Sequence, residues 1–218
     1  MTILKAPTVN FSLFGEEWLI TDYIQVSNPQ LRRIAKKIKG KNRDEVILKV
    51  VEWVAENIEY PLDYRGRPNA AQYAKKFKWF DGVYLAETPD ELRRYGWLFP
   101  NQTATIGKGI CFDSACLCTT LLRIKQIPAW TVLGAVLRTK SKRFLGLHAW
   151  TETIMENGTR VVIETTVHPH PPELIKTSQI YNGRLPITYD PFAWFNESEW
   201  KEDKEKVALY EGMILGKQ

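Results

Sequence analysis

A mostly apolar stretch in the middle of the chain constrains its fold more than any other feature. From Ile110 to Ile124, apolar or small residues cover nearly every face of a helix, so the pattern predicts a buried helix rather than an amphipathic one. Cys111 falls in its first turn, where the helix dipole and unpaired backbone N–H groups favour a thiolate. Arg123 and Lys125 stand at the other end, where positive charge is favoured. We therefore expect the rest of the chain to hold and serve this sulfur.

Hydrophobic spacing predicts further elements on both sides of this helix. Residues 29–38 have the spacing of a helix, and residues 42–58 form a clearer one, with a capping asparagine and a single apolar stripe. The second helix should end before Tyr60-Pro61, because proline disfavours helix at the preceding residue. Residues 130–137 read as a strand.

The chemistry suggested by Cys111 depends on His148, which begins an alternating strand over residues 148–154. A thiol at a helix N-terminus and an imidazole on a strand are the pair needed for nucleophilic attack on an acyl carbon. A third polar group normally binds the other ring nitrogen. Glu164, on a second strand over residues 160–166, is the carboxylate suited to that role.

The turn between these strands decides whether Glu164 can meet His148. A two-residue turn at Asn157-Gly158 would point Glu164 away from the histidine. A three-residue turn, residues 156–158, gives glycine the left-handed position of a bulged hairpin and sets Trp150 opposite Glu164. His148 then lies diagonal to the carboxylate, at about 7–8 Å between backbones. We expect the three-residue turn.

The sequence contains three blocks of residues in a fixed order. The first begins at Gly109 and reads G-x-C-x-D-x-A-x-L-x-x-x-L-L-R-x-x-x-I-P-A. The second is H-A-W-x-E, residues 148–152, and the third covers residues 161–166. The histidine follows the cysteine by 37 positions and the acid follows the histidine by 16. Together these blocks resemble the transglutaminase-like superfamily, over roughly residues 43–166.

The resemblance implies a papain-like α+β fold, with the nucleophile helix packed on an antiparallel sheet. It also implies a catalytic triad of Cys111, His148 and Glu164, and a set of possible activities: cysteine peptidase, peptide N-glycanase or amidase, and transglutaminase. Three positions depart from the family pattern. Glu164 replaces the usual aspartate, Gln126 the glycine before I-P, and Trp130 the arginine after I-P-A.

An acyl-transfer site also needs donors for the oxyanion. The backbone N–H of Cys111 is the natural first donor, and Gln102 and Trp97 are candidates for the second. Asp113, also part of the first block, is expected to act structurally, as a favourable charge in the first helical turn.

The formal net charge of +5 and the pI of about 9.0 indicate an anionic partner only if the charge is clustered. Residues 31–43 contain seven Lys or Arg and no acid. A solvated helix face is the favoured interpretation, because the aromatic interleaving typical of nucleic-acid sites is missing. A basic patch for nucleic acid or an anionic wall polymer is the alternative.

The cysteines, Cys111, Cys116 and Cys118, are odd in number and lie in one segment. This favours reduced thiols in the cytoplasm over a disulfide framework. Neither a signal peptide nor an apolar run of membrane-spanning length is apparent, so no membrane association is expected. His168 and His170 lack metal-site spacing relative to the cysteines, so no metal or cofactor is predicted.

We expect one transglutaminase-like domain over residues 1–218, with its core at about 43–190. An N-terminal arm, 1–42, and a C-terminal part, 191–218, should pack on that core. The arm should hold a short strand at 18–26, and the C-terminal part a helix at 198–215.

Many aromatic residues crowd into positions 69–100, and Thr88-Pro89 resembles a helix start. Aromatic residues at this density usually cover a core, although some could line a groove leading to Cys111.

The predicted function is that of a cytoplasmic thiol enzyme acting on a peptide or protein substrate. Cys111 should attack an amide or isopeptide carbonyl and form a thioester, assisted by His148. Hydrolysis is expected over transamidation, although the motif is common to both. The alternatives are a transamidating transglutaminase and a non-catalytic module that binds a partner through residues 69–100. No oligomeric state is indicated.

Overall fold

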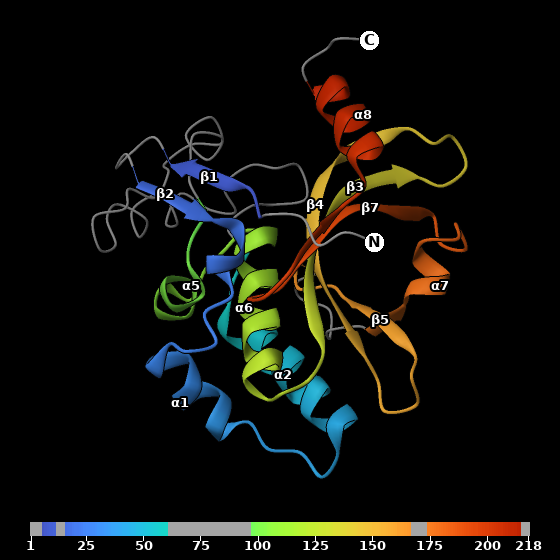
Figure 1. Cartoon of the computed structure of the whole chain (residues 1–218). Helices are drawn as coiled ribbons and strands as arrows, with labels where there is room; N and C mark the ends of the chain where they lie inside the picture. The colour runs from blue at the N-terminus through green and yellow to red at the C-terminus, as the bar shows by residue number, and fades with distance from the viewer. Residues whose placement is uncertain (1–5, 12–15, 61–96, 167–173, 215–218) are drawn as a thin grey trace.

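The computed structural model describes residues 6–11, 16–60, 97–166 and 174–214 (Figure 1). Its centre is a six-stranded sheet in the order β6-β5-β4-β3-β7-β8, antiparallel at every pairing. The strands of this sheet are β3 (Ala129–Arg138), β4 (Phe144–Ile154), β5 (Arg160–Ile163), β6 (Leu174–Lys176), β7 (Ile187–Phe195) and β8 (Trp200–Glu202). The other elements are β1 (Thr8–Phe11), β2 (Glu16–Leu19), η1 (Ile20–Tyr23), α1 (Pro29–Lys37), α2 (Arg43–Asn57), α5 (Pro100–Ile106), α6 (Cys111–Ile124), α7 (Thr177–Ile180) and α8 (Lys204–Ile214).

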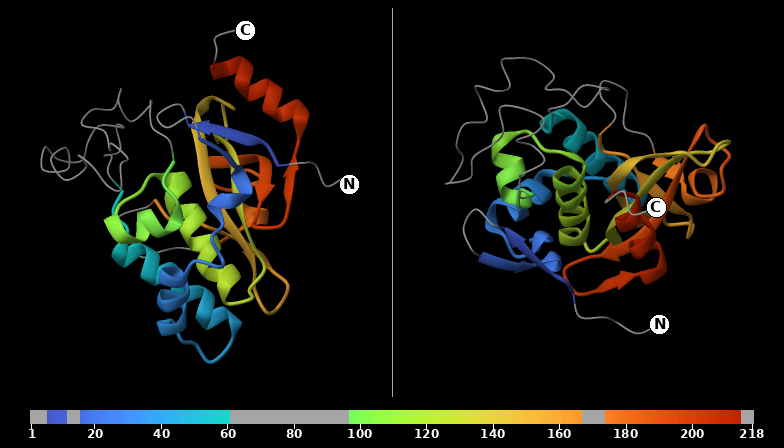
Figure 2. Two further views of the ribbon diagram at one scale, coloured as in Figure 1. Left: turned by 60° about the vertical axis from the view of Figure 1, so that its left-hand side comes forward. Right: turned by 90° about the horizontal axis from the view of Figure 1, so that it is seen from above.

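Helix α6 lies against β3 and β4 on one face of the sheet, and α1, α2 and α5 gather around its other sides (Figures 1 and 2). Every residue from Phe112 to Leu122 is buried. The predicted buried helix is therefore confirmed. So is the predicted fold class, an α+β architecture with the cysteine helix packed on an antiparallel sheet.

Three buried threonines join α6 to the sheet. The Thr131 hydroxyl on β3 donates to the Thr119 hydroxyl on α6, at 2.9 Å. The Thr151 hydroxyl on β4 donates to the carbonyl of Ala115, also at 2.9 Å. Because buried polar groups need hydrogen-bond partners, these bonds favour one position of the helix on the sheet.

The β4–β5 hairpin has the predicted register. Ile154 pairs with Arg160, and the Met155 N–H donates to the Thr159 carbonyl at 2.9 Å. Three residues remain in the loop, and Gly158 has a φ of +79°, the left-handed conformation that glycine adopts most readily. The three-residue turn is confirmed.

The backbone of β3 lies unusually close to the side chain of Trp150 on β4. A Cβ added to Gly134 would lie 2.3 Å from Cη2 of the Trp150 indole and 2.7 Å from the carbonyl oxygen of Asp190 on β7. Only glycine fits there. Trp150 packs with Val132 and Tyr189 in a core cluster on the face of the sheet opposite α6, which α7 covers through Ile180.

The arm does contain a short strand, but its predicted bounds, residues 18–26, overlap β2 only at residues 18 and 19. β2 ends at Leu19, whose N–H donates to Asp22 Oδ2 at 2.9 Å, and the chain continues as the 3₁₀ helix η1. The short acidic side chain competes with strand pairing for the backbone donor. Burial of Tyr23 then holds the turn against the core.

The predicted helix over residues 198–215 is correct only in its second part. Trp200 lies in β8, paired with Phe195 of β7, and its ring is buried at the sheet edge. Asp203 then accepts the N–H of Lys206 at 3.2 Å, as a helix N-cap does, and α8 begins at Lys204. The pairing of β8 with the adjacent strand β7 overrides a helical spacing that fits the sequence equally well.

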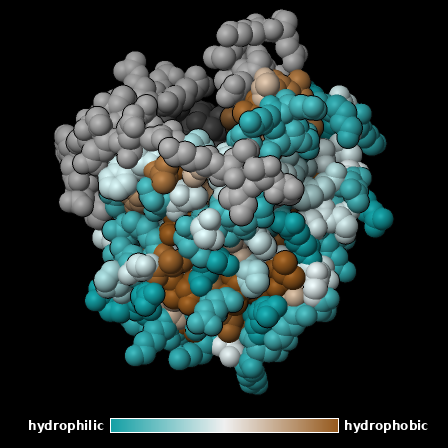
Figure 3. All heavy atoms as spheres, viewed as in Figure 1, coloured by the Kyte–Doolittle hydropathy of each residue, from teal (hydrophilic) through white to brown (hydrophobic). Residues whose placement is uncertain are grey.

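The N-terminal arm contributes to the main core, since Leu31 and Ala35 of α1 pack with α2 and α6. The seven basic side chains of residues 31–43 are all exposed. Most of the aromatic segment, and the predicted helix start at Thr88, lie outside the described residues. Hydrophilic residues dominate the described surface on the face seen in Figure 3, around a smaller apolar patch. Among the described residues, no helix combines the length and apolarity needed to cross a bilayer.

Candidate active site

Cys111 is the first residue of α6, and the G-x-C-x-D block builds its setting. Asp113 Oδ2 accepts the N–H of Ile110 at 3.0 Å, and Oδ1 accepts the N–H of Leu98 at 2.9 Å. The aspartate thus ties the incoming chain to the first turn of the helix. A Cβ on Gly109 would come within 2.8 Å of the Asp113 Cβ, so glycine lets the two residues approach.

Asp113 is a buried acid held by backbone donors. Burial raises the pKa of Asp113 to about 7, although the two N–H donors act in the opposite direction. Both oxygens are used in these bonds, which agrees with the structural role expected for this residue.

His148 on β4 and Glu164, directly after β5, form a close pair. His148 Nε2 and Glu164 Oε2 are 2.8 Å apart, and both side chains are largely buried. The other carboxylate oxygen, Oε1, accepts the backbone N–H of Thr166 at 2.9 Å and its hydroxyl at 2.6 Å. The hairpin register therefore brings the predicted base and the predicted acid together.

Charge keeps this pair ionised in spite of its burial. Burial lowers the pKa of His148, but the charge of Glu164 and the bonds to Cys111 and Glu164 outweigh it and raise that pKa to about 10. Burial would raise the pKa of Glu164, whereas His148, Thr166 and Tyr189 lower it to about 2. At neutral pH the pair is an imidazolium and a carboxylate.

Cys111 lies within hydrogen-bonding reach of the His148 ring. Because Nε2 faces Glu164, Nδ1 is the nitrogen left for the sulfur. The structure thus brings Cys111, His148 and Glu164 into one chain of contacts, from helix to strand to strand.

Tyr189 on β7 completes the surroundings of Glu164. Its hydroxyl donates to Glu164 Oε2, the same oxygen that faces His148. Its ring meets the imidazole edge-to-face at 5.5 Å. Burial, followed by the charge of Glu164, raises the pKa of Tyr189 well above its usual range, so the hydroxyl stays a donor. The sequence carried no local signal for Tyr189, because β7 reaches the site only by pairing with β3.

Tyr60 also belongs to these surroundings, although the sequence marked it only as a helix end. Burial, together with the nearby charges of Cys111, Asp113 and Glu164, raises the pKa of Tyr60 above its usual range, while the backbone N–H of Cys111 acts against them. Tyr60 is therefore beside the backbone donor expected to bind an oxyanion.

The two predicted oxyanion donors are placed differently. Trp97 stacks on Phe112, the residue after the nucleophile, with ring centroids 3.9 Å apart. Gln102 uses its carboxamide oxygen to accept the N–H of Phe99 at 2.9 Å, which caps α5, and it lines a cavity that none of the triad residues lines. Their oxyanion roles stay predictions.

The remainder of the H-A-W-x-E block serves the sheet. Glu152 is buried and accepts hydrogen bonds from Trp194 Nε1, at 3.3 Å, and from the Tyr181 hydroxyl. The Trp150 indole donates to that same hydroxyl at 3.0 Å. This network holds the Trp150 ring near that of His148, with the ring centroids 6.1 Å apart and the planes tilted by 32°.

The other two cysteines face the interior of the fold. Burial raises the pKa of Cys118 to about 12 against a hydrogen bond with Thr151, and it raises that of Cys116 well above its usual range. Both thiols are fully buried, so only Cys111 among the three is partly exposed.

Comparison with known proteins gives three likenesses. UPF0252 protein MJ1282 of Methanocaldococcus jannaschii is 27% identical over 128 residues, which are 59% of this chain and 31% of that protein, so the chain spans about a third of the relative. LapG of Legionella pneumophila superposes with a TM-score of 0.47 at 14% identity, over 91% of this chain and 96% of its own. A candidate cysteine protease from Cytophaga hutchinsonii superposes with a TM-score of 0.42 at 20% identity, over 83% of this chain and 50% of its own.

The family model of the transglutaminase-like domain matches residues 29–177, more than half of the 218 residues. All three sequence blocks and the three residues of the predicted triad fall inside this range. The chain belongs to the transglutaminase-like domain family.

Proposed function

We propose that this protein is a cysteine-dependent acyl-transfer enzyme that hydrolyses an amide bond in a peptide, isopeptide or glycopeptide. The observation that carries the proposal is the His148–Glu164 pair at 2.8 Å, with Cys111 near enough to the imidazole to help raise its pKa. Family membership agrees with it. The chemistry needs a reduced thiol, so the proposal includes a reducing compartment such as the cytoplasm.

In the first half of the reaction, Cys111 Sγ attacks the carbonyl carbon and a C–S bond forms. The backbone N–H of Cys111, at the N-terminus of α6, is the donor we assign to the developing oxyanion. His148, held as an imidazolium by Glu164, then gives its proton to the departing nitrogen as the C–N bond breaks. The products are a free amine and a thioester on Cys111.

In the second half, neutral His148 takes a proton from water, and the hydroxide attacks the thioester carbonyl. The C–S bond breaks, a carboxylic acid leaves, and the sulfur departs as a thiolate beside the His148 imidazolium, which is the pair that began the reaction. Glu164 stays a carboxylate throughout, which its low pKa supports.

The same acyl-enzyme could pass to an amine instead of water, which would make the protein a transglutaminase. The two outcomes are separated by profiling peptide, glycopeptide and wall-peptide substrates with and without an added primary amine. We expect a free carboxylic acid as product in both conditions. An amide product that replaces the acid when amine is present would assign transamidation.

A labelling experiment separates an enzyme from a non-catalytic binding module. With iodoacetamide at pH 7, we expect Cys111 to react much faster than Cys116 or Cys118. Burial alone would also slow those two cysteines, so the informative variant is His148→Gln. It should slow the labelling of Cys111 by about tenfold or more, because the positive imidazolium that favours a reactive sulfur is removed. An unchanged rate in His148→Gln would contradict the enzyme proposal.

A further inference from the structure

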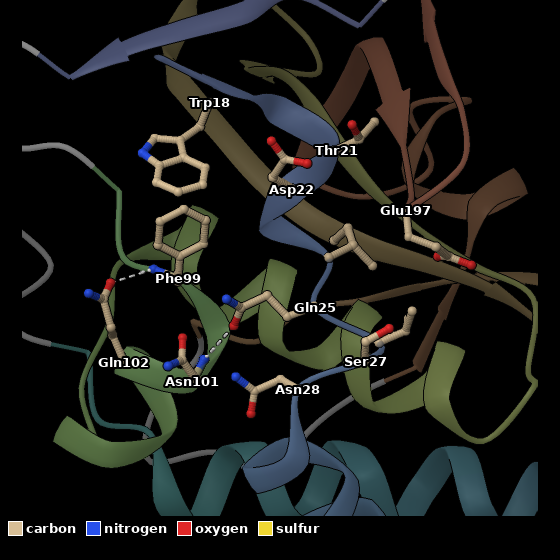
Figure 4. Close-up of a pocket in the computed structure, with 12 residues that line it drawn as sticks. Trp18, Thr21, Asp22, Gln25, Ser27, Asn28, Phe99, Asn101, Gln102 and Glu197 are labelled. Atoms are coloured by element: carbon tan, nitrogen blue, oxygen red, sulfur yellow. Dashed lines mark hydrogen bonds between the residues drawn. The ribbon is translucent and has the colours of Figure 1, made fainter. Parts of the chain in front are cut away.

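A second hollow lies between the segment that follows β2 and the start of α5 (Figure 4). It is a cavity of about 800 Å³ that opens to solvent, and none of Cys111, His148 or Glu164 lines it. Ligand pockets in proteins enclose about 300–1,000 Å³. The cavity therefore has room for a small ligand, and its use does not depend on the hydrolase proposal.

Three partly buried carboxamides on its wall have fixed orientations. Gln25 Oε1 accepts the N–H of Asn101 at 3.1 Å, and Gln102 Oε1 accepts the N–H of Phe99 at 2.9 Å, as Figure 4 shows. Asn28 Oδ1 accepts two N–H groups at the start of α1, at 3.0 and 3.3 Å. Within the described part of the chain, the NH₂ groups of these three side chains have no acceptor. Each oxygen already accepts at least one hydrogen bond, so the NH₂ group is the part of each side chain that is left to bond a ligand.

An aromatic side chain stands at one end of the cavity. Trp18 is 37% exposed and meets Phe99 edge-to-face, with ring centroids 5.3 Å apart (Figure 4). The negative faces of aromatic rings attract the slightly positive C–H groups of a ligand. A large exposed tryptophan beside fixed amide donors is suited to a ligand that has both C–H faces and oxygen acceptors.

The charge of the wall excludes anions. Among the residues that the structure describes, two carboxylates, Asp22 and Glu197, line the cavity, and no lysine or arginine does. Glu197 is paired with Arg123 behind it, which leaves Asp22 as the exposed negative group. Carboxylates accept hydrogen bonds from hydroxyl groups, whereas they repel phosphates and other carboxylates.

We propose that this cavity binds a neutral sugar, with the pyranose face against Trp18 and its oxygens on the amide donors. The donors of Gln25 and Asn28 come from the segment between η1 and α1, and that of Gln102 comes from α5. Donors from two segments of one cavity wall match a ring that carries oxygens on several sides. An extended peptide presents its polar groups along a line and fits this arrangement less well.

Isothermal titration of the full chain tests the proposal with chitotriose, cellotriose and maltotriose as probes. Trigalacturonate serves as the anionic comparison, and a tetraglycine peptide as the peptide comparison. We expect saturable binding of at least one neutral trisaccharide and none of trigalacturonate or tetraglycine. The proposal is overturned if no neutral trisaccharide binds, or if either comparison ligand binds as tightly.

Two variants locate the binding. Gln25→Glu keeps the oxygen that accepts the Asn101 N–H and removes the NH₂ donor, so the fold should persist while sugar affinity falls about tenfold. Trp18→Ala should abolish detectable binding. Gln179→Glu makes the same change on the exposed surface of α7 and should leave affinity unaltered. Equal affinities in wild type, Gln25→Glu and Trp18→Ala would place the sugar elsewhere and overturn the proposal.

Discussion

Both oxygens of Glu164 are occupied. One faces His148 and Tyr189, and the other accepts two bonds from Thr166. The extra methylene of glutamate, compared with the aspartate that the resemblance led us to expect, suits a diagonal cross-strand position, because the backbones there are about 7–8 Å apart. The longer glutamate side chain thus spans the diagonal distance that the hairpin register sets. The carboxylate reaches the imidazole, and hydrogen bonds to both of its oxygens fix its orientation.

Replacing Tyr189 by phenylalanine tests this arrangement at the residue scale. The change removes one hydrogen bond to a charged oxygen, worth about 1.5–3 kcal/mol, which corresponds to about one or two pKa units. We expect the pKa of Glu164 to rise by that amount from about 2, as followed by ¹³C NMR of its side-chain carboxyl carbon.

Tyr181→Phe is the matched control for this variant. Tyr181 is also a mostly buried tyrosine that donates to a buried carboxylate, but to Glu152 instead of Glu164. It should reduce stability to a similar extent and leave the titration of Glu164 unchanged. If both variants shift that titration equally, Tyr189 has no specific role at the site.

At the scale of elements, local and long-range features were not equally predictable. The β4–β5 register followed from residues 156–158, because turn geometry acts over a few positions. Tyr189 reaches the site because β7 pairs with β3, and these two strands are remote from each other in the chain. The strand at Trp200 pairs with the adjacent strand β7, but the same residues also fit a helical pattern. The cavity beside Gln102 could not be predicted either, since it needs three separate segments to come together.

The hairpin turn itself can be tested at Gly158. Its φ of +79° is strained for any residue with a Cβ, although nothing lies within 4 Å of where that Cβ would be. Gly158→Ala should therefore destabilise the fold by about 1 kcal/mol through backbone strain alone. Gly158→Asn should cost less, because asparagine tolerates this conformation better. Urea unfolding measures both variants, and equal losses would argue against the left-handed turn.

For the whole molecule, the Glu164–His148 pair makes stability depend on pH. Glu164 has a folded pKa of about 2 against an ordinary value of 4.5, so its contribution is present above pH 4.5 and is lost as pH falls toward 2. His148 has a folded pKa of about 10 against 6.5, so its contribution is complete below pH 6.5 and is lost as pH rises through 10. The pair therefore stabilises most between pH 4.5 and 6.5.

Urea unfolding across pH checks this window. The free energy of unfolding of Glu164→Gln should fall furthest below that of the wild type at pH 4.5–6.5, and the difference should narrow toward pH 2 and toward pH 10. Glu52→Gln, which breaks an exposed pair with Lys49, should change stability by less than about 1 kcal/mol at every pH. A constant difference for Glu164→Gln would contradict the ionised pair.

The buried threonine contacts between α6 and the sheet have a mechanical consequence. His148, Glu164 and Tyr189 all belong to the sheet or its margin, whereas Cys111 alone belongs to the helix. The site is thus assembled where the helix meets the sheet, with the base and its acid on the sheet and the nucleophile on the helix. Thr119, which bonds to Thr131 and contacts Thr151, fixes the position of the helix relative to the sheet. Sliding the helix would uncouple the sulfur from the imidazole while the His148–Glu164 pair stayed intact.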